Sequence, residues 1–116
     1  MMESENNNGV NEVENPPVEV GSFVAVYLAN WNLEPALGRV TKTTKKYFHI
    51  EYYKEVDQEW QPWIVKINNS NIVWTQKLSR DCIVLSNFEL DNNHLAMVHR
   101  EYIMRRYKEI NASKQE

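Results

Sequence analysis

Hydrophobic and polar residues alternate with a period of two along much of the chain, and this pattern predicts β-strands. The clearest alternation lies at residues 47–53, where Phe48, Ile50 and Tyr52 share one face and Tyr47, His49, Glu51 and Tyr53 share the other. The same reasoning predicts strands at 22–28, 36–41, 64–67, 72–74 and 81–85, a loop at 29–32 and polar turns at 42–46, 54–59 and 68–71.

The period changes after Asn87, and residues 91–112 are predicted to contain a C-terminal helix. Asp91, Asn92 or Asn93 is a suitable N-cap. The apolar face of this helix is formed by Leu95, Val98, Tyr102, Ile103, Tyr107 and Ile110. We expect this face to pack on the strands, and the alternative is that Met97, Met104 and Tyr107 are presented to a partner.

The first 18 residues differ from the rest in composition. They are rich in Asn and Glu, contain few large apolar side chains and end in the pair Pro16-Pro17. Such a segment cannot bury enough surface to offset the entropy of ordering, so it is predicted to be a disordered acidic arm. Several short strands and one helix then indicate a mainly β fold, with a small SH3-like barrel at 19–90 and the helix packed on or beside it.

Composition excludes several classes of protein. The single cysteine, Cys82, rules out an internal disulfide, and the three histidines show no ligand-like spacing with it or with one another. Only three glycines are present and none forms a phosphate-binding loop. No apolar run approaches the roughly 20 residues that span a membrane, and the N-terminus does not read as a secretory signal. We therefore expect an intracellular protein that is not an enzyme and has no cofactor, metal site or membrane contact.

Three segments resemble the chromo-barrel domains, which are relatives of Tudor domains. They are VGSFVAVY at 20–27, EPALGRV at 34–40 and KYFHIEYY at 46–53, followed by the Trp-Gln-Pro-Trp motif at 60–63. The resemblance covers about residues 19–66 and rests on short motifs. It implies a nuclear, chromatin-associated reader or adaptor whose partner is a histone tail or another methylated-lysine peptide.

In this family an aromatic cage binds the methylated lysine, and its residues can be carried over position by position. The resemblance implies a cage of Tyr27, Trp31, Tyr53 and Trp60, with Val56 in the place of a further aromatic residue. The first-strand wall falls at Tyr27 or Leu28, and Trp63 corresponds to a tryptophan that is usually structural. If Trp60 lines the cage, Trp60→Ala should abolish peptide binding and leave the fold intact.

Acidic residues surround these aromatic positions. Glu51, Glu55, Asp57 and Glu59 are predicted to form an acidic rim beside the cage. A methylated ammonium keeps its charge and loses hydrogen-bond donors, so ring faces and carboxylates together suit such a guest. The structural alternative is that the tryptophans fill the core and the acids form a solvated turn.

Two further functions remain open from the sequence. Residues 20–116 hold 13 basic and 11 acidic residues, a mild excess that permits weak contact with nucleic acid through Lys42, Lys45, Lys46 and Lys54. Alternatively, the domain is an interaction module with a degenerate cage, which binds a subunit of a chromatin complex through its helix or a strand face.

Overall fold

The computed structural model describes residues 17–29 and 31–114, with the side chains of residues 31–33 left out. The acidic N-terminal segment at 1–18, which was predicted to be disordered, therefore lies almost entirely outside the described residues. The elements are β1 (Phe23–Leu28), β2 (Trp31–Thr43), β3 (Tyr47–Val56), β4 (Glu59–Pro62), β5 (Ile64–Ile67), β6 (Ser70–Val73), β7 (Thr75–Ser79), a short 3₁₀ helix (Arg80–Cys82), β8 (Ile83–Phe88) and α1 (Met97–Lys114).

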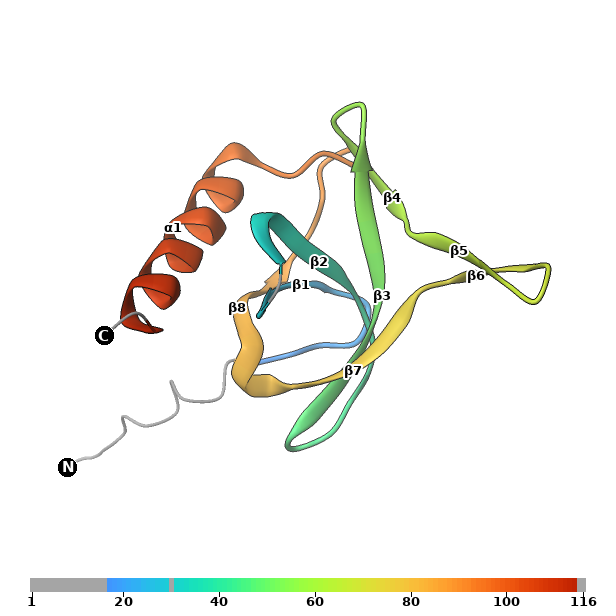
Figure 1. Ribbon diagram of the computed structural model, residues 1–116, viewed down its shortest axis with the longest axis horizontal. Coiled ribbons are helices and arrows are strands. Elements are labelled where there is room, and N and C mark those ends of the chain that lie inside the picture. Colours follow the sequence, from blue (N-terminus) through green and yellow to red (C-terminus); the bar gives the residue numbers. More distant parts are fainter. Residues whose placement is uncertain (1–16, 30, 115–116) are drawn as a thin grey trace.

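One curved sheet forms the body of the domain (Figure 1). Its strands follow the order β4-β3-β2-β1-β8, and β7 pairs with β3 on the same edge as β4. The predicted fold class, a mainly β domain with a C-terminal helix, is confirmed. The sheet does not close into a hydrogen-bonded barrel, because β8 is bonded to β1 and is joined to β7 only through the 3₁₀ helix.

Two-residue turns connect the strands of two hairpins, one in this sheet and one outside it. Asp57 and Gln58 connect β3 to β4, and Asn68 and Asn69 connect β5 to β6; all four have positive φ. Positive φ at both central residues is typical of the type I′ turn, whose twist matches that of the flanking strands. The predicted polar turns at 54–59 and 68–71 are thus shorter than expected, because the strands continue into them.

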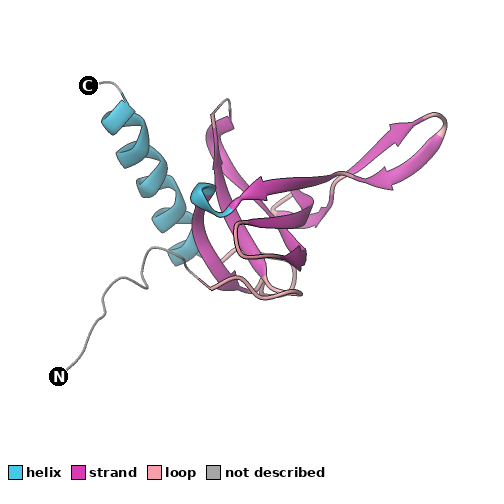
Figure 2. Ribbon diagram, turned by 90° about the horizontal axis from the view of Figure 1, so that it is seen from below, coloured by secondary structure: helices cyan, strands magenta, loops and turns pink. Residues whose placement is uncertain are grey.

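The β5–β6 hairpin leaves the body as a separate two-stranded sheet. From here on, the arm means this hairpin and not the acidic N-terminal segment. Figures 1 and 2 show the arm and α1 on opposite sides of the domain. Ile64, Ile67 and Ile72 on the arm are 47%, 51% and 44% exposed, so this hairpin carries apolar side chains into solvent.

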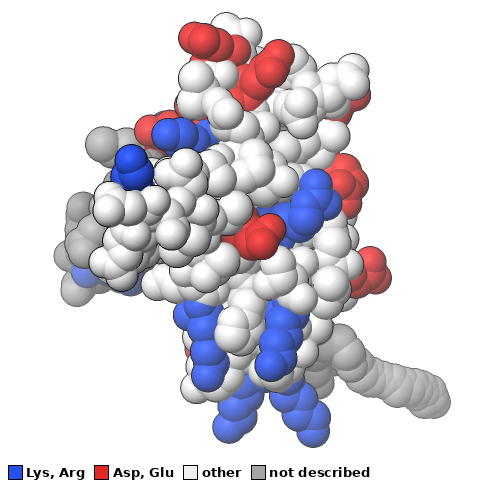
Figure 3. Space-filling view, turned by 90° about the vertical axis from the view of Figure 1, so that its right-hand side faces the viewer, with Lys and Arg blue, Asp and Glu red and all other residues white. Residues whose placement is uncertain are grey.

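The turn between β2 and β3 forms a basic end of the domain. It contains Lys45 and Lys46, both exposed, and lies at the bottom of Figure 1. Lys and Arg side chains gather at this lower end in the space-filling view (Figure 3).

The core lies on both faces of β1. Val24 and Val26 contribute to one buried cluster, and Phe23 and Ala25 to the other. The apolar run FVAV is buried throughout, because the curled sheet closes over one face and α1 covers the other. The predicted alternation in β3 is confirmed, with Phe48, Ile50 and Tyr52 buried and the residues between them more exposed.

The C-terminal helix packs on its own domain, as expected. It begins at Met97 rather than near residue 91, because Asn92 and Asn93 adopt positive φ in a tight turn closed by Asp91 and His94. Ile103 and Tyr107 are its buried residues. Val98 was predicted on this face and is instead 67% exposed.

The hydroxyl of Tyr107 ties the helix to the sheet. It donates a hydrogen bond to the Val26 carbonyl (2.6 Å) and accepts one from the Ala36 N–H (3.0 Å), and both contacts are buried. Tyr107→Phe should therefore lower the free energy of unfolding by about 1–3 kcal/mol, because two buried backbone groups lose their partner. Urea denaturation of both proteins measures this loss, and equal midpoints would show that these bonds contribute nothing.

Burial raises the pKa of Tyr107 to about 12. The folded state therefore holds this phenol in its neutral form more strongly than the unfolded chain does. The corresponding stability is complete below pH 10, the ordinary range of tyrosine, and is lost as the pH rises from there toward 12.

Candidate functional site

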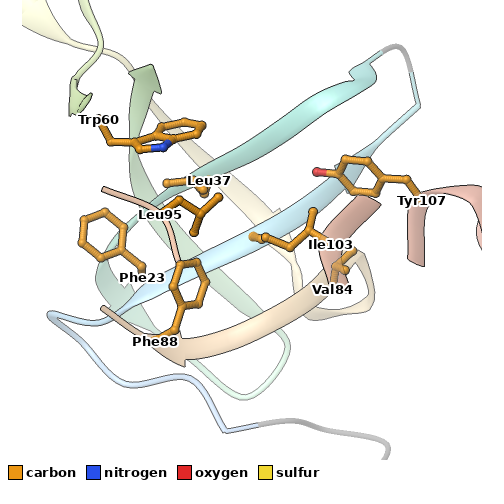
Figure 4. Packing of buried hydrophobic residues seen from close by; sticks show 9 residues of the cluster. Phe23, Leu37, Trp60, Val84, Phe88, Leu95, Ile103 and Tyr107 are labelled. Carbon is orange, nitrogen blue, oxygen red and sulfur yellow. The ribbon is translucent and has the colours of Figure 1, made fainter. Parts of the chain in front are cut away.

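The cage residues implied by the resemblance do not surround an open pocket. Trp60 is only 3% exposed and belongs to the core cluster under α1, and Tyr27 and Tyr53 are half-buried against that cluster. Figure 4 shows the Trp60 indole next to Leu37, with Leu95 just beyond it. The prediction of Trp60 as an exposed cage wall is wrong, because the segment after β8 covers this face of the sheet.

The other cage positions do not form an open cage either. The Tyr53 ring packs edge-on against Phe23, with centroids 4.9 Å apart. Tyr27 contacts the Tyr107 ring and donates a hydrogen bond to Asn111. The side chain of Trp31 lies outside the described residues. Val56, in the place of a further cage ring, is 39% exposed at the end of β3.

The predicted acidic rim is dispersed. Glu55 forms an ion pair with Arg100 and, with Asp57, lines a cleft of about 550 Å³ beside the first turn of α1. Glu51 lies opposite Arg39 in the register of β3 and β2, and Glu59 is the first residue of β4. The rings and the acids therefore do not form a single site.

A different set of aromatic residues does line an open pocket. Its volume is about 160 Å³, and it lies where the arm joins the body. The residues around it are Leu28, Pro35, Ala36, Tyr52, Trp63, Trp74 and Gln76. We call this the junction pocket.

A closed ring of backbone hydrogen bonds positions its three aromatic residues. The Tyr52 N–H donates to the Trp74 carbonyl (2.9 Å), the Trp74 N–H to Trp63 (2.8 Å) and the Trp63 N–H back to Tyr52 (2.8 Å). The ring forms because β3 pairs with β7 up to Glu51 and with β4 from Tyr53. Tyr52 thus occupies the branch point at which the arm departs, and rigid backbone fixes the pocket walls.

The rings of these residues meet at steep angles. Trp63 and Trp74 are T-shaped, with centroids 5.1 Å apart and planes at 86°, and Tyr52 lies 5.3 Å from Trp74 at 47°. Trp74 is 43% exposed, Trp63 is half-buried and Tyr52 forms the floor. Two roughly perpendicular indoles make a corner that can present ring faces to one guest.

The floor of the pocket is polar at one point. The Tyr52 hydroxyl donates to Oε1 of Gln76 at 2.6 Å, and burial raises the pKa of Tyr52 to about 12. The phenol therefore stays neutral at physiological pH and keeps its bond to Gln76. No acidic or basic residue lines the junction pocket among the described residues, so the site selects by ring faces and shape.

The structure also rearranges the predicted basic set. Lys42, Lys45 and Lys46 lie at or beside the β2–β3 turn, whereas Lys54 is five positions along β3 from His49, roughly 17 Å away. Lys77 and Arg80, which the sequence analysis did not select, lie near the turn instead. Lys77 lies in the polar strand TQKLS at 75–79, which shows no alternation, and Arg80 follows that strand in the 3₁₀ helix.

Other candidate chemistry lies apart from these surfaces. Cys82 packs against the second core cluster, and burial raises its pKa from 9.0 to about 11, so the thiolate that would act as a nucleophile is disfavoured. Within the described part of the chain, His, Cys, Asp and Glu side chains form no group of three or more that could hold a metal. In the same part of the chain, no helix is both long enough and apolar enough to cross a membrane.

Comparison with known proteins finds no match for this chain. It matches no family model, no curated protein and no solved structure.

Proposed function

We propose that this domain is a non-enzymatic reader that binds a methylated lysine side chain in the junction pocket. The supporting observation is the corner formed by Trp63 and Trp74 over Tyr52, held by three backbone hydrogen bonds. A methylated ammonium is attracted to ring faces by roughly 0.5–2 kcal/mol per contact. Its methyl groups also suit a pocket with apolar walls.

The proposal keeps the function that the resemblance to chromo-barrel and Tudor-like domains implies, and moves its site. Tyr52, Trp63 and Trp74 take the roles that the resemblance gave to Tyr27, Trp31, Tyr53 and Trp60. Because the pocket walls lack carboxylates, we expect higher methylation states, which donate fewer hydrogen bonds, to bind better. The proposed partner is a histone tail or a similar basic peptide, met in the nucleus within a chromatin complex.

An NMR titration with lysine peptides tests this proposal. The labelled protein is titrated with unmodified, mono-, di- and trimethylated forms of one peptide, while the four indole N–H signals are followed. We expect the Trp63 and Trp74 signals to move with increasing methylation and the Trp60 signal to stay, because Trp60 is buried. Shifts that are equal for unmodified and trimethylated peptides would reject a methyl-lysine site.

Trp74→Ala should weaken binding of the trimethylated peptide between about 2-fold and 30-fold, since one ring contact is lost. Ile67→Ala, on the outer part of the arm, is the matched control and should bind as the parent protein does. Unchanged affinity in Trp74→Ala would show that the peptide binds elsewhere.

A protein-interaction module remains the second candidate, and the exposed isoleucines of the arm favour it. Val65 and Ile67 of β5, with Trp63 just before the strand, share one face with Ile72 and Trp74 across the hairpin. The apolar surface therefore continues from the junction pocket outward. Chemical shifts confined to the arm and independent of methylation would support this candidate over the reader.

A further inference from the structure

A second surface lies at the β2–β3 turn, away from the junction pocket. The strand register brings Lys42 opposite His49 and His49 opposite Lys77. Cross-strand neighbours share a face and strands lie about 4.8 Å apart, so these three side chains form a row roughly 10 Å wide. The row mixes two ammonium groups with an imidazole on one exposed face.

Beside this row is a hollow of about 280 Å³. Its walls are formed by Lys45, Lys46, Tyr47, Ser79, Arg80 and Asp81. We call the row and the hollow together the basic edge. Its cations are Lys42, Lys45, Lys46, Lys77 and Arg80, and Asp81 is the acid that lines it.

Arg80 is fixed within this surface. Its Nη2 donates to the Thr43 hydroxyl at 2.6 Å, and its backbone N–H donates to the Lys46 carbonyl at 3.1 Å. Its Nε is buried and has no hydrogen-bond partner among the described residues. A guanidinium held in place by these bonds, next to two lysines, is suited to an anion such as a phosphate.

Tyr47 adds an aromatic surface to these charges. Its side chain is 42% exposed, and the Lys77 ammonium lies 4.6 Å from the ring centroid. Proteins that bind single-stranded nucleic acid combine cations that follow the backbone with rings on which bases stack. A site for a free anion would gain nothing from an exposed ring.

We propose that the basic edge binds single-stranded nucleic acid, with phosphates against Lys42, Lys45, Lys46 and Arg80 and a base on Tyr47. The single strand is favoured over a duplex because its bases are free to stack on a side chain. This surface does not depend on the junction pocket, so either proposal can fail without the other.

Fluorescence anisotropy of the full chain with labelled 12-nucleotide RNA and DNA strands, and with duplex DNA, tests the proposal. The double variant K45E/K46E should weaken binding at least 10-fold, whereas K54E/K66E, an equal charge change elsewhere, should change it less than 2-fold. For two lost phosphate contacts, the slope of log affinity against log salt should fall in magnitude by about 1.4.

Tyr47→Ala tests the stacking surface separately. It should weaken binding of the single strands about 5-fold or more.

Several outcomes would overturn the proposal. They are no binding at 25 mM salt, equal losses in the two double variants, tighter binding of duplex than of single strands, or binding to anionic vesicles without binding to any strand. Circular dichroism checks that each variant folds, and K45Q/K46Q replaces the charge reversal if it does not. A preference for RNA over DNA, or the reverse, would identify the natural strand within the proposal.

Discussion

Trp60→Ala is expected to destabilise the whole domain rather than to empty a binding site. Trp60 is 3% exposed and packs in the cluster that contains Phe23, Leu37 and Leu95. Removing a buried tryptophan side chain typically costs about 3–5 kcal/mol, a large part of the stability of a small domain. Urea denaturation followed by circular dichroism should show a much lower midpoint or a chain unfolded without urea.

Trp74→Ala is the matched control, because it makes the same substitution at a 43% exposed ring. Its loss of unfolding free energy should be less than half that of Trp60→Ala, since partial exposure leaves less apolar surface to lose. If Trp60→Ala kept the urea midpoint of the parent protein and lost peptide binding, Trp60 would be a binding residue and its buried packing would be contradicted.

The strand pattern of the sequence predicted side-chain faces well but not what covers each face. Alternation placed Tyr52 and Tyr53 on opposite faces of β3, and the structure confirms this. Which face is open depends on α1 and the segment before it, and these are distant in sequence. Tyr52 lies in the core as expected, 3% exposed, and also forms the floor of the junction pocket. Tyr53, expected outside, packs against Phe23.

A signal for the junction pocket was present in the sequence. Trp63 and Trp74 each lie five positions from the turn residues Asn68 and Asn69. A two-residue hairpin pairs positions that are equally distant from its turn, so the two indoles had to face one another across the arm. The ring of hydrogen bonds to Tyr52 could not be read in this way, because it depends on β3 exchanging β7 for β4 as its neighbour.

Only part of the basic edge could be identified from the sequence. The lysines of the β2–β3 turn are adjacent in sequence and were found directly. Lys77 and Arg80 reach the same end only because β7 pairs with the first half of β3. β7 is mostly exposed, with Leu78 alone partly buried, so its sequence has no hydrophobic period to reveal it.

Ile103→Ala is expected to have the second largest effect, by loosening α1 from the sheet. Ile103 is fully buried and, with Tyr107, supplies the buried contacts of a helix whose other positions are largely polar. Most helix stability in proteins comes from packing an apolar face, and Ile→Ala in a core costs about 2–5 kcal/mol. Urea denaturation measures this loss, and amide exchange should show lower protection across α1.

Val98→Ala is the control on the same helix, since Val98 is 67% exposed. It should change the unfolding free energy by less than about 0.5 kcal/mol, because little surface is lost and alanine favours the helix. Because Tyr27 packs against the Tyr107 ring of α1 and donates a hydrogen bond to Asn111, loosening of the helix in Ile103→Ala should also shift the NMR signals of the Tyr27 ring. Unchanged Tyr27 ring signals and unchanged amide protection in Ile103→Ala would mean that the helix does not hold this face closed.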